Sequence, residues 1–396
     1  MSMSEDRGSG KVSGTALRAG RATAAKHQSV LAHIPELDGL RAIAVILVMI
    51  NHYGPTSIPF AWRIKAVGWV GVDLFFVLSG FLITRILLET RTHSHYYRDF
   101  YVRRTLRIFP LYYCVLLVLF ASMLFWNHGE RYHDLTEWGS PLWSWMYLGN
   151  VQMAVLGHTP HIFALIPLWS LHVEEQYYLL FPILVRALRP QTLFKVLVGM
   201  LILSPLLRVL LSWSTPDNPY LSYMLLPCRF DALAIGALIA LRPVHIGRRL
   251  LGALTIGGGV LVYYLFATIG HNLWSDPSTR VWGYSSFPAV FGCILLWILL
   301  YRSSWQTNWL NVAPLQFIGK TSYATYLLQA PLAGAMGTLL SGTPLWSNDV
   351  YRFVLICATT IGIAALSWRF LERPLLQLKE RLAPHEAIQT TIGHPA

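Results

Sequence analysis

Long apolar segments alternate with short polar ones along this chain, and this pattern predicts its secondary structure. A helix needs roughly 17 to 25 mostly apolar residues to cross a bilayer, and ten segments come near that length. They lie near residues 38–54, 68–88, 106–126, 169–187, 193–213, 226–241, 249–269, 285–301, 317–340 and 349–370, the sixth being short. We therefore expect an all-α fold, a polytopic membrane helical bundle of about ten transmembrane helices.

The distribution of lysine and arginine predicts the orientation of these segments, because cytoplasmic loops collect basic residues. If the N-terminus lies inside, 24 of the 31 basic residues fall on the inner side. The seven exceptions are Arg63, Lys65, Arg131, Arg208, Arg229, Arg280 and Arg352. This distribution favours ten spans with the N-terminus and the C-terminus both cytoplasmic.

The composition excludes several classes of protein. Hydrophobic residues make up 54% of the 396 positions and charged residues only 13%, whereas soluble proteins average about 25% charged residues. A soluble enzyme and a nucleic-acid-binding domain are therefore excluded. The net charge of +12 follows from the orientation of the spans, so we expect a lipid bilayer and no nucleic acid as partner.

The polar parts of the chain predict its domain organisation. Residues 1–35 are expected to form a disordered basic cytoplasmic tail, residues 36–376 a transmembrane domain, and residues 377–396 a short cytoplasmic tail without an appended soluble domain. The longest outward segment, about 127–168, carries four histidines, His128, His133, His158 and His161. Their spacing matches no zinc pattern, so no metal is expected.

Ionisable residues within the apolar segments are candidates for function, because charge is costly inside a bilayer. With the orientation above, six of them lie in the outer half and are expected to converge in one polar cavity. They are His52, Asp73, Glu174, Glu175, Arg229 and Asp231. Ser79 is expected only to bond its own helix backbone.

Arg41 and His52 are expected to share one face of the first helix. They are 11 residues apart, which is about three turns, or about 16 Å along the axis. Such a polar stripe suits a transfer site that crosses the membrane. The alternative is an interfacial histidine and an arginine that reaches the membrane surface.

Arg104 and Arg107 begin the third span on one helix face, with Arg103 beside them. Guanidinium groups near a helix N-terminus can bind phosphates in bidentate fashion. Basic residues that merely anchor the helix on the inner side would give the same cluster, so both interpretations stay open.

Six stretches of the chain resemble a known family. They are LDGLRAIAVILVMINHYG at 37–54, GVDLFFVLSGFLIT at 71–84, FYVRRTLRIFPLYY at 100–113, PLWSLHVEEQYYLLFP at 167–182, FIGKTSYATYLLQAPL at 317–332 and FLERPL at 370–375. Their order, spacing and wording closely resemble the acyltransferase-3 family of bacterial integral-membrane O-acyltransferases. The resemblance runs from about 36 to 376, and the soluble SGNH-type domain that some members carry is not seen.

The resemblance implies a function and a location. It implies transfer of an acyl group, commonly acetyl, from cytoplasmic acyl-CoA to a hydroxyl of a carbohydrate or glycosylated acceptor, by a multi-pass protein of the bacterial inner membrane.

The resemblance also implies site residues. The family's essential histidine falls on His52 and its partner arginine on Arg41. The RxxR motif falls on Arg104 and Arg107, the glutamate before proline on Glu372, and the paired acids on Glu174 and Glu175.

Histidine is the usual base near neutral pH. We therefore expect His52 to deprotonate the acceptor hydroxyl, with an acyl-histidine intermediate as the less favoured variant. The residue that orients the imidazole is expected to be Glu174, Glu175 or Asp73. Many members have a second histidine where this chain has Gln329, which cannot take a proton at neutral pH.

Two other classes of function remain as alternatives. A proton-coupled transporter of a saccharide or lipid-linked intermediate would also have about ten spans and buried charges, although it often shows paired repeats, and no convincing repeat is found. A non-catalytic assembly subunit would not need His52.

Overall fold

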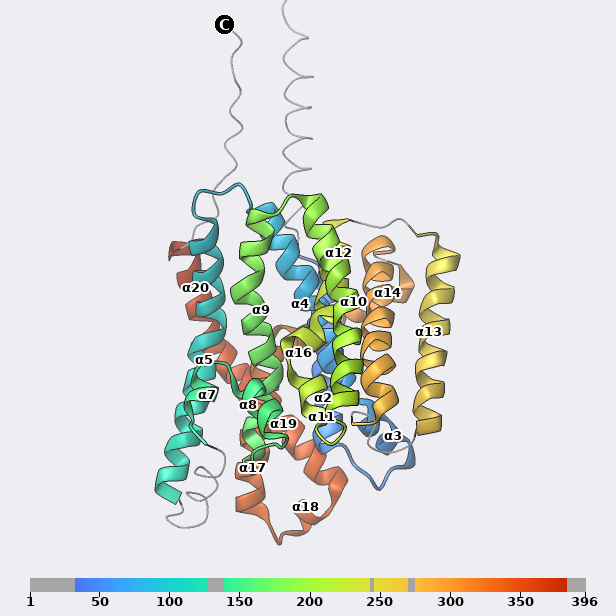
Figure 1. Ribbon diagram of the computed structural model, residues 1–396. Helices are drawn as coiled ribbons and strands as arrows, with labels where there is room; N and C mark the ends of the chain where they lie inside the picture. Colours follow the sequence, from blue (N-terminus) through green and yellow to red (C-terminus); the bar gives the residue numbers. More distant parts are fainter. Residues whose placement is uncertain (1–32, 127–138, 243–245, 270–274, 303, 383–396) are drawn as a thin grey trace, which may run out of the picture. The chain divides into compact units, whose positions relative to one another are not determined.

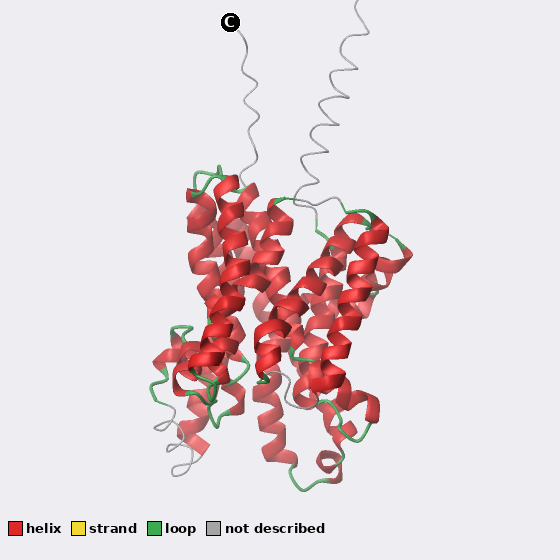
Figure 2. Cartoon of the chain, turned by 45° about the vertical axis from the view of Figure 1, so that its right-hand side comes forward, coloured by secondary structure: helices red, strands yellow, loops and turns green. Residues whose placement is uncertain are grey.

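The computed structural model describes residues 33–126, 139–242, 246–269, 275–302 and 304–382. Within these ranges every regular element is a helix (Figure 2). The chain divides into two units, Met1–Pro35 and Glu36–Ala396, and the architecture below is that of the second. The all-α class is thus confirmed for the described residues.

Ten principal helices run side by side in this unit (Figure 1). They are α2 (Pro35–Tyr53), α4 (Val70–Glu89), α5 (Tyr96–Trp126), α9 (Leu168–Ala187), α10 (Pro190–Ser214), α12 (Phe230–Leu241), α13 (Arg248–Ile269), α14 (Tyr284–Leu300), α17 (Ser322–Leu340) and α19 (Asp349–Ser367). Each predicted apolar segment falls on one of them, which confirms the predicted order of helices.

Several helical stretches of the described residues are long and apolar enough to cross a membrane, so the chain is a multi-pass helical membrane protein. There are five: Val70–Glu89, Tyr96–Ser122, Pro190–Ser214, Thr279–Leu300 and Asp349–Leu378. Length and composition alone do not select α2 and α9, which carry charged residues, or α12, which has 12 residues. Ten spans therefore stay a prediction.

Short helices connect the principal ones. They are α3 (Pro59–Val67), α7 (Leu142–Trp145), α8 (Gly149–Leu156), η1 (Phe163–Leu165), α11 (Pro219–Met224), η2 (Leu226–Arg229), η3 (Thr279–Gly283), α15 (Trp305–Asn308), η4 (Trp309–Asn311), α16 (Ala313–Lys320), α18 (Pro344–Ser347), η5 (Trp368–Glu372) and α20 (Arg373–Leu382). In Figure 1, α3, α7, α8, α11 and α18 lie toward the lower ends of the principal helices, which is the end where α2 leads through Tyr53 into α3.

Helices α4 and α12 touch backbone to backbone at the centre of the packing. A Cβ atom at Gly80 would collide with the carbonyl oxygen of Leu233, and one at Gly236 would collide with that of Val77. Small residues allow such close approach between membrane helices. The short α12 is enclosed by α4, α10 and α14, so its apolar residues meet protein.

Glycines also bring α2 against its neighbours. A Cβ at Gly71 of α4 would collide with the carbonyl oxygen of Ala44, and one at Gly319 of α16 would collide with that of Asp38. Helix α2 is therefore held tightly along its length. This packing positions the two residues of α2 that the sequence singles out, Arg41 and His52.

Candidate active site

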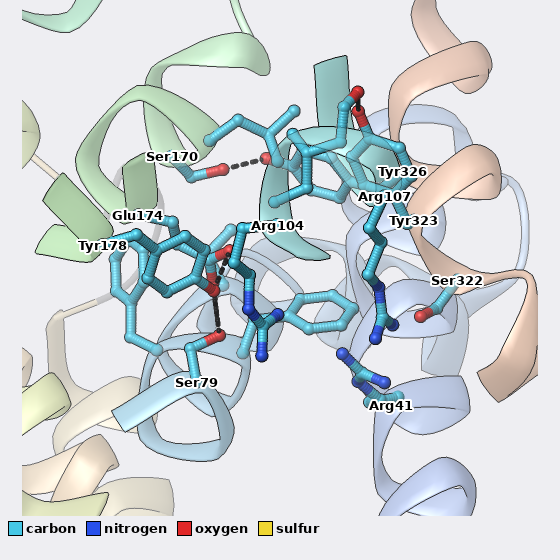
Figure 3. Close-up of a pocket in the computed structure, with 15 residues that line it drawn as sticks. Arg41, Ser79, Arg104, Arg107, Ser170, Glu174, Tyr178, Ser322, Tyr323 and Tyr326 are labelled. Atoms are coloured by element: carbon cyan, nitrogen blue, oxygen red, sulfur yellow. Dashed lines mark hydrogen bonds between the residues drawn. The ribbon is translucent and has the colours of Figure 1, made fainter. Parts of the chain in front are cut away.

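A cavity lies among α2, α4, α5, α9 and α17 (Figure 3). It leaves a volume of about 70 Å³ to the centres of water molecules. Its lining consists of Arg41, Val72, Phe75, Phe76, Ser79, Arg104, Arg107, Ile108, Ser170, Leu171, Glu174, Tyr178, Ser322, Tyr323 and Tyr326. We call it the arginine cavity. Four residues that the sequence proposed for the site, Arg41, Arg104, Arg107 and Glu174, meet here.

Three guanidinium groups face this cavity. In Figure 3, Arg41 and Arg107 point toward one another and Arg104 reaches into the same space. Arg104 and Arg107 also act electrostatically on Arg41, and the guanidinium of Arg104 lies 5.4 Å from the ring centre of Tyr178. None of the three has an ion pair within 4.0 Å among the described residues. The cavity therefore carries excess positive charge suited to an anion with several charges.

Glu174 is the carboxylate of the arginine cavity, and two hydroxyl groups hold it. Ser79 Oγ donates to Glu174 Oε1 at 2.7 Å, and the Tyr178 hydroxyl donates to Oε2 at 3.0 Å. Glu174 and Tyr178 are four residues apart on α9, so they lie on one helix face. The expectation that Ser79 bonds only its own backbone is wrong, because a carboxylate of the neighbouring helix is a stronger acceptor.

Arg103 and Glu372, which the sequence also proposes for the site, are not among the residues that line the arginine cavity. Arg103 precedes Arg104 by one position, which turns it to another helix face. Glu372 is buried in η5 and accepts a hydrogen bond from Ser367 Oγ at 3.2 Å. Arg107 acts electrostatically on Glu372, so Glu372 can position that arginine.

A second cavity, of about 350 Å³, is lined by His52, Tyr53, Lys65, Phe163, Ala333, Gly334, Trp346, Arg352 and Ile356. We call it the histidine cavity. It shares no lining residue with the arginine cavity. Arg41 and His52 thus line different cavities although both belong to α2.

The imidazole of His52 meets aromatic rings and one amide. The ring centres of Tyr53 and Phe163 lie 5.7 and 5.8 Å from it, both edge-on. Gln329 is its side-chain hydrogen-bonding neighbour. Nδ1 of His52 and Oε1 of Gln329 are nevertheless both buried without a well-formed hydrogen bond among the described residues. A substrate hydroxyl could satisfy these two atoms.

One face of α17 runs between the two cavities. Ser322 and Tyr326 line the arginine cavity, and Ala333 lines the histidine cavity. Gln329 lies between them at helical spacing and donates through Nε2 to the backbone oxygen of Tyr326 at 3.2 Å. Helix α17 therefore borders both cavities, as α2 does.

The six ionisable residues expected in one polar cavity do not converge. Asp73 Oδ1 lies 3.1 Å from Arg229 Nη1, and Asp231 Oδ2 lies 2.7 Å from Arg208 Nη2, with every partner at most 2% exposed. A buried charge needs a partner of opposite charge. Each of these two carboxylates is paired with an arginine and not with the histidine. Asp73 does not line the cavity of His52.

Glu175 is not among the residues that line either cavity. It acts electrostatically on the phenols of Tyr112, Tyr147 and Tyr323, and its Oε1 is buried without a hydrogen-bond partner within the described ranges. None of the three acids proposed to orient the imidazole lines the histidine cavity. The side chain that acts on the imidazole by hydrogen bonding is instead Gln329, at the position where the sequence departs from the family pattern.

Metal ligands were predicted to be lacking, and the described residues contain no candidate cluster of them. No group of three or more His, Cys, Asp or Glu side chains is arranged to hold a metal ion in the part of the chain that is described. Of the four loop histidines, His128 and His133 lie outside the described residues.

Sequence reasoning missed several residues of these cavities. Tyr178 and Tyr326 stand in the motifs above, but the sequence assigns them no role. In the sequence, Lys65 and Arg352 are only exceptions to the inward bias of basic residues, yet both line the histidine cavity. Their location on the predicted outer side, against the general distribution of basic residues, was the signal by which the sequence could have identified them.

Comparisons with known proteins identify relatives of this chain. The peptidoglycan O-acetyltransferase OatA of Listeria monocytogenes is 30% identical over 364 residues, which cover 87% of this chain and 56% of that protein. The O-acetyltransferase OatA of Staphylococcus aureus is 28% identical over 369 residues, covering 87% and 57%. The chain thus spans little more than half the length of these relatives.

No solved structure matches the chain. The family model described as an acyltransferase domain matches residues 34–369, which is most of the chain and includes both cavities. On this match, the chain belongs to that family of membrane acyltransferases.

Proposed function

We propose that this protein is a membrane O-acyltransferase of the bacterial inner membrane. It moves an acyl group, most simply acetyl, from cytoplasmic acyl-CoA to a hydroxyl of a carbohydrate acceptor, as the names of its relatives suggest. The observation that carries the proposal is the pairing of two cavities along α2, one with three arginines and one with a histidine. The family match favours this function over a transporter or an assembly subunit.

The arginine cavity is suited to the donor. Guanidinium groups bind phosphate oxygens through paired hydrogen bonds, so Arg104 and Arg107 hold the phosphates of coenzyme A, with Arg41 adding a third positive charge. With ten spans and both termini in the cytoplasm, the start of α5 that carries Arg104 opens on the side where acyl-CoA is made. Glu174 keeps the arginines apart and in place.

His52 acts on the acceptor. Its unpartnered Nδ1 takes the proton of the acceptor hydroxyl, whose oxygen attacks the thioester carbonyl carbon. The carbon–sulfur bond breaks, the ester forms, and the thiolate leaves with the proton that His52 gives up. Gln329 orients the imidazole, the role first expected of Asp73, Glu174 or Glu175. The side chains of α17 between the cavities have to move to let the thioester reach the histidine.

The test uses the purified full chain in nanodiscs with acetyl-CoA and soluble peptidoglycan fragments, and it measures the release of free thiol. General base catalysis typically contributes about 10²- to 10⁴-fold, so His52→Ala is expected to slow turnover by that factor. His158→Ala, an exposed histidine that lines neither cavity, is the matched control and keeps the wild-type rate.

Two results would reject the proposal. One is a His52→Ala variant that turns over at the wild-type rate. The other is uptake of saccharide by vesicles containing the protein without loss of thioester, which would support the transporter instead.

A further inference from the structure

Two cations share the cavity of His52. Lys65 comes from α3 and Arg352 from α19, and no residue of that cavity's described lining is acidic. Neither cation has an ion pair with a carboxylate within 4.0 Å among the described residues. The histidine cavity is therefore positively charged in its own right.

Both cations keep donors available for a ligand. Lys65 Nζ donates to the backbone oxygen of Gly54 at 3.2 Å, which uses one of its three N–H groups. Arg352 Nη1 donates to the backbone oxygen of Trp346 at 3.1 Å, which uses one of five. These bonds fix the two side chains at the cavity wall and leave most of their donors unused.

The nearest carboxylate is already engaged. Asp349 acts electrostatically on Lys65, but its two oxygens accept four hydrogen bonds from the loop after α2. Thr56 N and Ser57 N donate to Oδ2 at 2.7 and 2.9 Å, Thr56 Oγ1 donates to Oδ2 at 3.3 Å, and Ser57 Oγ donates to Oδ1 at 2.7 Å. Asp349 thus holds this loop, and it offsets only part of the charge of two cations.

The rest of the wall is aromatic or aliphatic. Tyr53, Phe163 and Trp346 line the cavity, and their flat faces suit the apolar faces of sugar rings. The volume of about 350 Å³ falls in the usual range of small-molecule sites, about 300 to 1,000 Å³. Aromatic walls with a few convergent polar groups are typical of such sites.

We propose that the histidine cavity selects an anionic saccharide as acceptor, with Lys65 and Arg352 binding a carboxylate or phosphate close to the hydroxyl that is acylated. This inference rests on the proposed function and names its acceptor class. Lys65 acts electrostatically on His52, so an anion bound to Lys65 lies near the base. The two cations set the affinity for the acceptor and leave proton removal to the histidine.

The first experiment compares acceptors that differ mainly in the charge of the group at C6. Methyl glucuronide carries a carboxylate where methyl glucoside carries a hydroxymethyl group, and glucose 6-phosphate tests the phosphate. With the wild-type chain in nanodiscs of neutral lipid and acetyl-CoA as donor, we expect a KM about tenfold lower for the charged acceptors. We expect kcat to differ little among the three.

Variants then assign the preference to the two cations. Lys65→Met and Arg352→Gln are each expected to raise KM for the glucuronide about tenfold and to change KM for the glucoside much less. Lys65→Arg keeps the charge and is expected to retain the preference. Arg63→Gln is the matched control, because Arg63 lies on the same short helix but is exposed and outside the cavity.

The inference fails if the wild type treats charged and neutral sugars alike, or if the variants weaken both equally, as lost packing alone would do. Saturation-transfer NMR of the same sugars with the same proteins measures binding without turnover. If no sugar is acetylated but the charged ones bind better through Lys65 and Arg352, the charge preference stands and the proposed reaction falls.

The pH dependence gives an independent readout. Burial, and then the positive charge of Arg352, lower the pKa of Lys65, whereas Asp349 opposes this shift. The lysine therefore loses its charge at a lower pH than an ordinary lysine, and the preference for glucuronide is expected to decline, as the pH is raised, before an ordinary lysine would lose its proton. His52, Tyr53, Asp349 and Arg352 are the other titratable groups nearby. Lys65→Arg is expected to keep the preference, because guanidinium stays protonated, and a decline of equal size in this variant would contradict the assignment.

Discussion

Buried arginines occur in two regions of this protein, and the regions differ in how the charge is balanced. Between α4, α10 and α12, Arg229 and Arg208 each have a carboxylate of their own, Asp73 and Asp231. Around the arginine cavity three guanidinium groups share the single lining carboxylate of Glu174. The first region is neutral and closed, and the second is positive and hollow.

The difference separates charge that holds the fold from charge that serves a ligand. An unpaired charge inside a bilayer protein is costly, so an arginine that only connects helices is expected to have its own acid. An excess of positive charge persists where an anionic substrate supplies the missing partner. Local pairing therefore predicts which variants should lose stability and which should lose activity.

The largest effect is expected from breaking a buried pair. Arg229→Met leaves the carboxylate of Asp73 buried without its partner, which typically costs about 3–5 kcal/mol. Thermal unfolding of the detergent-solubilised protein, followed by intrinsic tryptophan fluorescence, measures the loss. The double variant Asp73→Leu/Arg229→Met removes both charges and is expected to recover much of the stability. If Arg229→Met alone is as stable as the wild type, the paired arginines do not stabilise the fold as proposed.

An intermediate effect is expected from the arginine cavity, on activity. Arg104→Gln or Arg107→Gln removes charged hydrogen bonds worth about 1.5–3 kcal/mol, so KM for acetyl-CoA should rise roughly 10- to 100-fold while thermal stability changes little. Acetyl-pantetheine lacks the nucleotide phosphates and should be used equally well by variant and wild type. Arg103→Gln is the neighbouring control, and an equal effect there would show that position in the cavity is irrelevant.

The smallest effect is expected from the hydroxyl groups that hold Glu174. Ser79→Ala removes one of its two donors, a hydrogen bond to a charged group worth about 1.5–3 kcal/mol at most, and a several-fold fall in kcat/KM is expected. Thr84→Val on the same helix removes a hydroxyl that donates to its own backbone, at Gly80 O. Steady-state kinetics should show a smaller fall in kcat/KM for this control. A larger fall for Thr84→Val than for Ser79→Ala would contradict a role for Glu174 in the site.

The sequence predicts the helices well, because hydrophobic pattern and helix length are local properties. Every predicted apolar segment falls on a helix, and even the short sixth segment is found, with α12 beginning at Phe230 after a turn of 3₁₀ helix. The motif resemblance likewise predicts that Arg41, Arg104, Arg107 and Glu174 belong to the functional site. All four line one cavity.

The pairing of side chains across helices was beyond the sequence. Six ionisable groups that residue number places in the outer half of the bundle divide among two ion pairs and two cavities, with Glu175 in neither cavity, a division that no spacing within one segment reveals. Asp73 meets Arg229 from a helix more than 150 positions away. The role of Gln329 beside His52 is equally non-local, since it depends on how α17 packs against α2.

The backbone contact between α4 and α12 constrains how the protein can change shape. With no room for a Cβ at Gly80 or Gly236, neither helix can slide or rotate past the other without steric overlap. We expect α4 and α12 to move as a single rigid unit through the catalytic cycle. Any opening that admits a sugar or releases a thiol is then expected to come from movement of the surrounding helices, such as α17, which borders both cavities.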